Sequence, residues 1–116
     1  MSTQITVFAG GDLDISAVVV DDAGSAVDVS GATIEFNVIP EEGGTAVIDL
    51  DETSDPTQIT GDASGNINAL LSASDMALDE GTYLAQFKIT DGSSNVQYVP
   101  DGGNYIIIIV KDSVFT

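Results

Sequence analysis

The chain has 116 residues and a formal net charge of −17, because 19 aspartates and glutamates stand against Lys88, Lys111 and no arginine. This length corresponds to a single domain spanning residues 1–116. Nucleic-acid backbones and anionic membranes are held by lysine and arginine, so neither is expected as a partner. We interpret the negative charge as a solubility surface suited to a saline habitat, with a cationic partner as the alternative.

The composition also lacks cysteine, histidine and tryptophan. Without cysteine, neither a disulfide framework nor a thiolate metal site is available. Without histidine, the chain has no usual general base and lacks the commonest transition-metal ligand. Residues Met1–Gln4 contain no basic region followed by an apolar core, so no signal peptide is expected.

Apolar and polar residues alternate along most of the chain, which predicts short β-strands. We expect strands at Ile5–Phe8, Leu13–Val19, Val27–Val29, Thr33–Ile39, Val47–Leu50, Ile59, Ile67–Leu71, Tyr83–Ile89, Val96–Tyr98 and Tyr105–Val110. Turns rich in glycine, aspartate and serine separate these strands. The segment Ser72–Gly81 breaks the alternation, and we expect one helical turn there, capped by Ser72 or Ser74.

About seven to nine short strands without a long helical period predict an all-β fold, an immunoglobulin-like antiparallel β-sandwich. A small barrel is the alternative. The stretch Asp79–Tyr83 resembles the D-x-G-x-Y pattern of the immunoglobulin tyrosine corner, in which the tyrosine hydroxyl bonds back to the backbone. Ala85 stands where an antibody domain has its cysteine, so a true antibody-type domain is not expected.

The last predicted strand is apolar on both faces, because Tyr105, Ile107 and Ile109 alternate with a second large apolar set. A small sandwich buries one face of each strand, so the other face needs a cover. We predict that the second set points outward and docks against another protein, supported by two valines of the early strand if the strands are neighbours. The predicted interface residues are Ile106, Ile108, Val110, Val18 and Val20. The alternative is that Ile5–Phe8 folds over this face.

Acidic clusters raise the question of calcium, which takes six to eight oxygen ligands. The best candidate loop contains Asp49, Asp51, Glu52 and Asp55, although it does not match the EF-hand spacing. Runs of aspartate are expected in the turns of so acidic a chain, so no metal or other cofactor is predicted. Serines without a histidine or arginine to activate them, and few aromatic residues, argue against an enzyme.

From the Leu13 strand onward, the layout resembles the immunoglobulin-like domains of tailed-phage virion proteins, including the N-terminal domain of the baseplate upper protein. The matching stretches are Asp22–Ser25, Val27–Thr33, Ile34–Val38, Gly65–Leu71 and Gly81–Tyr83. The second of these, similar to the family's "V-D-L-[ST]-G-A-T", is the most specific. The chain departs from the family in its acidity and in lacking a fused second domain.

This resemblance implies a non-enzymatic structural protein of the virion, an accessory decoration or cement protein on the capsid. Its partners would be other virion proteins, either the major capsid protein or tail proteins, and it would be present in many copies, with a homo-oligomer as an option. One alternative is an adaptor of the tail or baseplate. Another is a carbohydrate- or cell-surface-binding module, for which Tyr98, Tyr105 and Phe115 are the available aromatic residues.

Overall fold

The structure is a computed structural model that describes residues 3–100, 104–112 and 114. Nine strands are present in this part of the chain. They are β1 (Thr3–Phe8), β2 (Leu13–Val18), β3 (Thr33–Pro40), β4 (Ile48–Asp51), β5 (Ile59–Gly61), β6 (Asn66–Leu71), β7 (Gly81–Thr90), β8 (Val96–Val99) and β9 (Ile106–Lys111). The described residues contain no helix that is long and apolar enough to cross a membrane.

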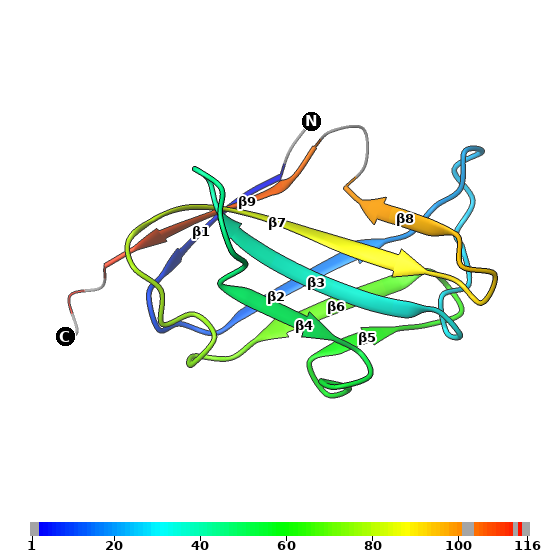
Figure 1. Ribbon diagram of the computed structural model, residues 1–116, viewed down its shortest axis with the longest axis horizontal. Helices are drawn as coiled ribbons and strands as arrows, with labels where there is room; N and C mark the ends of the chain where they lie inside the picture. The colour runs from blue at the N-terminus through cyan, green and yellow to red at the C-terminus, as the bar shows by residue number, and fades with distance from the viewer. Residues whose placement is uncertain (1–2, 101–103, 113, 115–116) are drawn as a thin grey trace.

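Two sheets form the layers of a sandwich (Figure 1). The larger sheet has the strand order β1-β9-β7-β3-β4, and β8 also pairs with β7; the smaller sheet has the order β2-β6-β5. Strands β9 and β8 share one side of β7, pairing with residues 81–85 and 87–90 in turn. All pairs are antiparallel except β1–β9, which is parallel. The predicted all-β sandwich is therefore confirmed.

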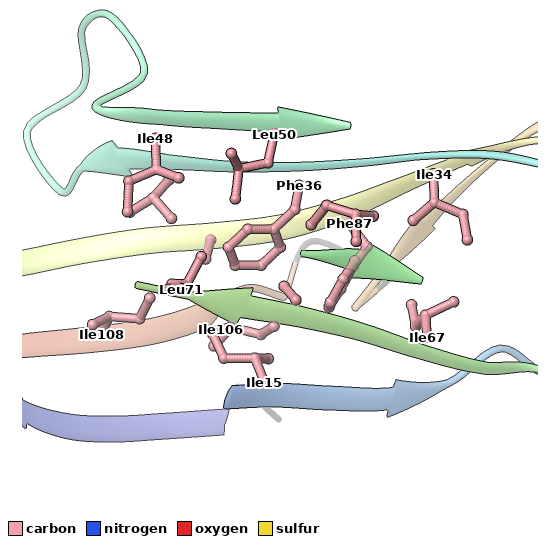
Figure 2. Packing of buried hydrophobic residues seen from close by; sticks show 14 of the residues in the cluster. Ile15, Ile34, Phe36, Ile48, Leu50, Ile67, Leu71, Phe87, Ile106 and Ile108 are labelled. Atoms are coloured by element: carbon pink, nitrogen blue, oxygen red, sulfur yellow. The ribbon is translucent and has the colours of Figure 1, made fainter. Parts of the chain in front are cut away.

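The core lies between the sheets and is built from alternate residues of each strand. Phe36 of β3 and Phe87 of β7 are fully buried, and their ring centroids are 4.8 Å apart. In Figure 2, Ile15 of β2 and Ile106 of β9 lie on the opposite side of this pair from Leu50. Burial of a large apolar side chain stabilises a fold by about 2 kcal/mol, so this alternation is the main reason for the strand faces observed.

The predicted tyrosine corner is present. The Tyr83 hydroxyl donates a hydrogen bond of 2.7 Å to the carbonyl oxygen of Asp79. Burial, followed by the negative charges of Asp79 and Glu42, raises the pKa of the Tyr83 hydroxyl, so it stays a donor. This bond fixes the chain where it enters β7, the strand that contacts β3, β8 and β9.

The segment before the corner forms one hydrogen-bonded turn rather than a helix. The N–H of Met76 donates to the carbonyl of Ser72 at 3.0 Å. The Ser72 hydroxyl accepts from the N–H of Asp75, while the Asp75 carboxylate accepts from the N–H of Ser72. This reciprocal pair is the capping-box arrangement, which agrees with the prediction that Ser72 caps a single turn.

Candidate docking surface

The structure contradicts the predicted docking face of β9. Ile108 and Val110 are fully buried and Ile106 is 5% exposed, so these side chains belong to the core. The opposite set is the one that faces outward, and Ile107 and Ile109 are half-buried. The prediction that the last strand is apolar on both faces was right, but the two faces were exchanged.

The pairing of β9 explains this orientation. Ile108 lies beside Tyr83 and Ile106 beside Ala85, and both partners are inward positions of β7. Lys111 continues the alternation of Ile107 and Ile109, and it is exposed. A lysine in phase with one set of side chains indicates that this set faces solvent, so the signal was present in the sequence.

Strand β1 does not fold over either face of β9. It lies beside β9 in the same sheet, with Ile5 next to Ile108 and Val7 next to Val110. The alternative cover that the sequence left open is therefore wrong in its geometry: β1 extends the sheet sideways. The outer face of β9 is screened only in part, by neighbours such as Leu84, which pairs with Ile107.

Val18 and Val20 are exposed, by 52% and 42%, but they are not neighbours of β9. They lie instead beside β8, where Tyr98 is 47% exposed. Together with Val99 and Pro100, these residues line a hollow of about 130 Å³ at the edge of the sandwich. We call the set Val18, Val20, Tyr98, Val99 and Pro100 the β2–β8 patch.

Hydrogen bonds hold the two sides of this patch together. The Gln97 side-chain amide donates to the carbonyl oxygen of Val20 at 3.0 Å, which ties β8 to the end of β2. On the other side, β8 pairs with β7, placing Tyr98 beside Lys88. Among the residues that the structure describes, the only other one that lines the hollow is Gln97, so this described lining carries no charge. In a domain with a net charge of −17, an uncharged apolar surface of this kind is a candidate for protein contact.

The calcium candidates do not assemble into a site. The Asp51 carboxylate accepts the N–H of Ser54 at 2.6 Å, and the Asp55 carboxylate accepts the N–H of Asp51 at 3.2 Å. Both carboxylates thus brace their own loop. Across the described residues, no group of three or more acidic side chains is placed to hold a metal ion, so the structure does not bring Asp49, Asp51, Glu52 and Asp55 together as a metal site.

A second surface lies on the outer face of the β2-β6-β5 sheet. Ser16, Asn68 and Thr60 occupy one row across its three strands, and the Ser16 hydroxyl donates to the side-chain Oδ1 of Asn68 at 2.7 Å. The shallow groove around this row measures about 380 Å³. Its centre is polar and uncharged, which sequence reasoning missed because the three residues are distant in the chain.

The fold is that of an immunoglobulin-like β-sandwich. A structure from a photo-crosslinking study of cell-adhesive interactions of VGSC beta subunits matches with a TM-score of 0.51 and 18% identity, covering 97% of this chain and 93% of that chain. Two further structures are weaker likenesses. The ZIG-8–RIG-5 IG1–IG1 heterodimer has a TM-score of 0.45 and 17% identity, covering 97% of this chain and 84% of that chain. Murine CRIg has a TM-score of 0.41 and 12% identity, covering 95% of this chain and 92% of that chain.

At 18% identity, the likeness to the VGSC beta-subunit structure shows the fold alone. No protein-family model matches the sequence, and no curated protein sequence matches it. The resemblance to phage virion domains therefore stays a prediction.

Proposed function

We propose that this domain is a non-enzymatic accessory structural protein of a tailed-phage particle, a decoration or cement protein of the capsid. It docks onto other virion proteins through the β2–β8 patch. The observation that carries this proposal is the gathering of exposed apolar side chains from β8 and the end of β2 around one hollow, whose lining is uncharged in the part of the chain that the structure describes. Large exposed apolar side chains that cluster in this way mark contact surfaces.

The patch alone supports weak binding. Burying the exposed half of a valine or tyrosine side chain contributes about 1 kcal/mol. The loss of translational and rotational freedom on association costs at least about 4 kcal/mol. One patch of this size therefore needs further contacts or many linked copies, and multivalent display on a symmetric particle supplies such linkage. High negative charge keeps the unbound domain soluble and separate before assembly.

Two further observations support a structural role. The stretches from Asp22 to Tyr83 resemble phage virion domains in sequence, and the most specific of them is Val27–Thr33. Within the described residues, the Ser16 hydroxyl donates to Asn68 and the Ser72 hydroxyl donates to Asp75. Neither hydroxyl is hydrogen-bonded to a histidine or lysine that would act as its general base. Such serines are not activated as nucleophiles.

The test is mass spectrometry and electron microscopy of purified particles of the phage whose genome encodes the chain. The proposal predicts the domain in intact particles, in many symmetric copies clustered at the three-fold or six-fold axes of the capsid lattice. Rings around a single axis would favour the alternative, a tail or baseplate adaptor. Particles that lack the protein would overturn both.

The second candidate is a carbohydrate-binding module, and the polar row at the centre of the groove on the β2-β6-β5 sheet favours it. The Asn68 amide nitrogen has no hydrogen-bond partner among the described residues, and Thr60 lies beside it in the same row. Val18 and Leu70 are exposed next to this row and offer apolar contacts to a sugar ring. Of the predicted aromatic residues, Phe115 lies outside the described residues.

Glycan-array binding by the wild type, with loss of that binding in Asn68→Ala, would favour this module. The capsid proposal predicts no glycan binding. Asn68 does not line the hollow of the β2–β8 patch, so the capsid proposal predicts that Asn68→Ala leaves particle attachment unchanged.

A further inference from the structure

The outer edge of β2 has no partner strand in the described part of the chain. The even-numbered residues of β6 direct their backbone groups toward β5. The N–H of Leu70 donates to the backbone carbonyl of Gln58, and the carbonyl of Asn66 accepts from the backbone N–H of Asp62. The odd-numbered residues of β6 therefore face β2, where Ala69 pairs with Ile15. Hydrogen-bonding groups alternate in direction along a strand. The backbone groups of Asp14, Ser16 and Val18 thus point away from β6, toward the open edge.

A cavity of about 390 Å³ runs beside this open edge, between the two sheets. Its walls are residues 14–17 of β2, Ile5 of β1, Val99 and Pro100 at the end of β8, and Ile106 of β9. Val99 and Pro100 also line the hollow of the β2–β8 patch, so the cavity and the hollow adjoin at the end of β8. The cavity therefore lies beside free backbone groups and has mostly apolar walls.

These two features together fit one kind of ligand. An extended chain that adds to a sheet edge gains affinity from backbone hydrogen bonds and specificity from pockets that receive alternate side chains. The free edge offers the first, and the cavity beside it offers the second. We propose that an extended segment of a partner protein pairs with β2 as a fourth strand and places alternate apolar side chains in this cavity.

The acidic residues near β2 determine which side chains the bound segment carries on its solvent-facing side. Asp14 lies on the outer face of β2, and Asp12 immediately precedes the strand. The lysines Lys88 and Lys111 both lie on the other sheet, on β7 and β9. Opposite charges on directly neighbouring strands are favourable, so the bound segment carries lysine or arginine beside Asp14. A second copy of this chain does not fit, because its own net charge is −17.

This inference rests on the proposed docking role and adds to it. The β2–β8 patch alone supports only weak binding and needs further contacts. Strand pairing along β2 supplies these contacts as backbone hydrogen bonds. It does not depend on whether the partner belongs to a capsid or a tail.

The probes are two ten-residue peptides, one alternating valine with lysine and threonine, the other carrying glutamate in place of lysine. Amide hydrogen exchange is followed by NMR at low salt. In the free protein, the amides of Asp14, Ser16 and Val18 exchange faster than those of Ile15 and Ala17. At about ten times its Kd, the basic peptide slows the three fast amides about tenfold. The acidic peptide leaves them unchanged.

Ser16→Pro supplies the blocking variant, with Ser16→Ala as its control. Proline is tolerated on edge strands where its missing N–H faces solvent, and it removes an outward donor of β2. The basic peptide is expected to protect the Ser16→Ala protein and not the Ser16→Pro protein. Asp14→Lys is expected to reverse the preference between the two peptides.

Protection of the three amides in the free protein, or equal binding to the proline and alanine variants, would overturn strand pairing. Equal protection by both peptides would overturn the assignment of a basic partner. These measurements use peptides and the isolated domain, without particles, so they test strand pairing separately from the proposed virion role. If strand pairing fails and the virion role is right, the wild-type protein still attaches to particles through the β2–β8 patch.

Discussion

At the residue scale, three turns use the same arrangement of an aspartate. The carboxylates of Asp21, Asp62 and Asp91 each accept backbone N–H groups two and four residues further along, at 2.8 to 3.0 Å. The third residue after each aspartate has a positive φ, and it is Gly24, Gly65 or Ser94. Many of the acidic side chains in the turns are thus structural, which explains why they did not assemble into a metal site.

The first prediction concerns pH. Hydrogen bonds from Asn66 lower the pKa of Asp62, and hydrogen bonds from Asn95 and then Ser93 lower that of Asp91. Because the folded-state pKa lies below the unfolded value of about 3.9, the unfolded state binds more protons in this range. The stability contributed by these carboxylates is present above about pH 3.9 and is lost as the pH falls through the folded-state pKa.

Carboxyl ¹³C titration by NMR checks this expectation. The Asp62 and Asp91 midpoints should lie below those of the same residues in the urea-unfolded chain, which are expected near the model-peptide value of about 3.9. Midpoints equal to or above the values in urea would contradict the role assigned to these turns.

The second prediction concerns the tyrosine corner. Tyr83→Phe removes the hydrogen bond to the Asp79 carbonyl, and the free energy of unfolding should fall by about 1 kcal/mol. Tyr98→Phe is the matched control, since Tyr98 is exposed, and it should change stability by less than about 0.5 kcal/mol. Urea denaturation measures both. Equal effects would show that the corner does not fasten β7.

At the scale of an element, the two faces of β9 provide the sharpest comparison. Ile108→Ala should cost about 3 kcal/mol, because the residue is fully buried and its truncation leaves a cavity. Ile107→Ala should cost about 1 kcal/mol, because its side chain is only half-buried. Denaturant unfolding of the two variants gives the difference. A larger loss for Ile107→Ala would restore the orientation first predicted from the sequence.

Local patterns in the sequence predicted much of this fold. Alternation located β3 and β7, and the Gly81–Tyr83 stretch predicted the corner because its hydrogen bond spans only four residues. The direction in which β9 faces was mistaken because both of its sides are apolar, so alternation alone cannot choose between them. Lys111 contained the deciding information.

The candidate docking surface was harder to predict. Val18 was identified as exposed, but its neighbour Tyr98 is 80 residues away, and local periodicity contains no information on which strands meet across a sandwich edge. The open edge of β2 could not be predicted from local periodicity either. It depends on β1 pairing with β9 rather than β2, a choice that is settled by packing of the whole domain.

At the scale of the whole molecule, charge and salt determine how stable the unbound domain is. Spread evenly over 6660 Å² of surface, 19 carboxylates lie about 19 Å apart. This spacing exceeds the Debye length of about 8 Å at physiological salt but falls inside the value of about 30 Å at 0.01 M. Repulsion is therefore screened in saline media and felt when salt is removed.

The fourth prediction follows from this spacing. Raising NaCl from 0.01 to 0.15 M should increase Tm by about 4 °C, which corresponds to about 1 kcal/mol in a domain of this size. Asp22→Lys together with Glu42→Lys, both at exposed positions, should reduce this increase. Differential scanning calorimetry measures the four conditions. A Tm that is independent of salt would show that repulsion does not limit stability.

The central claim is that the domain docks through the β2–β8 patch. Its most direct test is attachment of purified domain to particles that lack it, comparing the double variant Val18→Asp and Tyr98→Asp with Val47→Asp. All three positions are exposed by more than two-fifths, but Val47 lies outside the patch, so the control adds a charge elsewhere. We predict that the double variant loses attachment at least tenfold while Val47→Asp attaches like wild type. Unchanged attachment of the double variant, with its fold verified by circular dichroism, would contradict the claim.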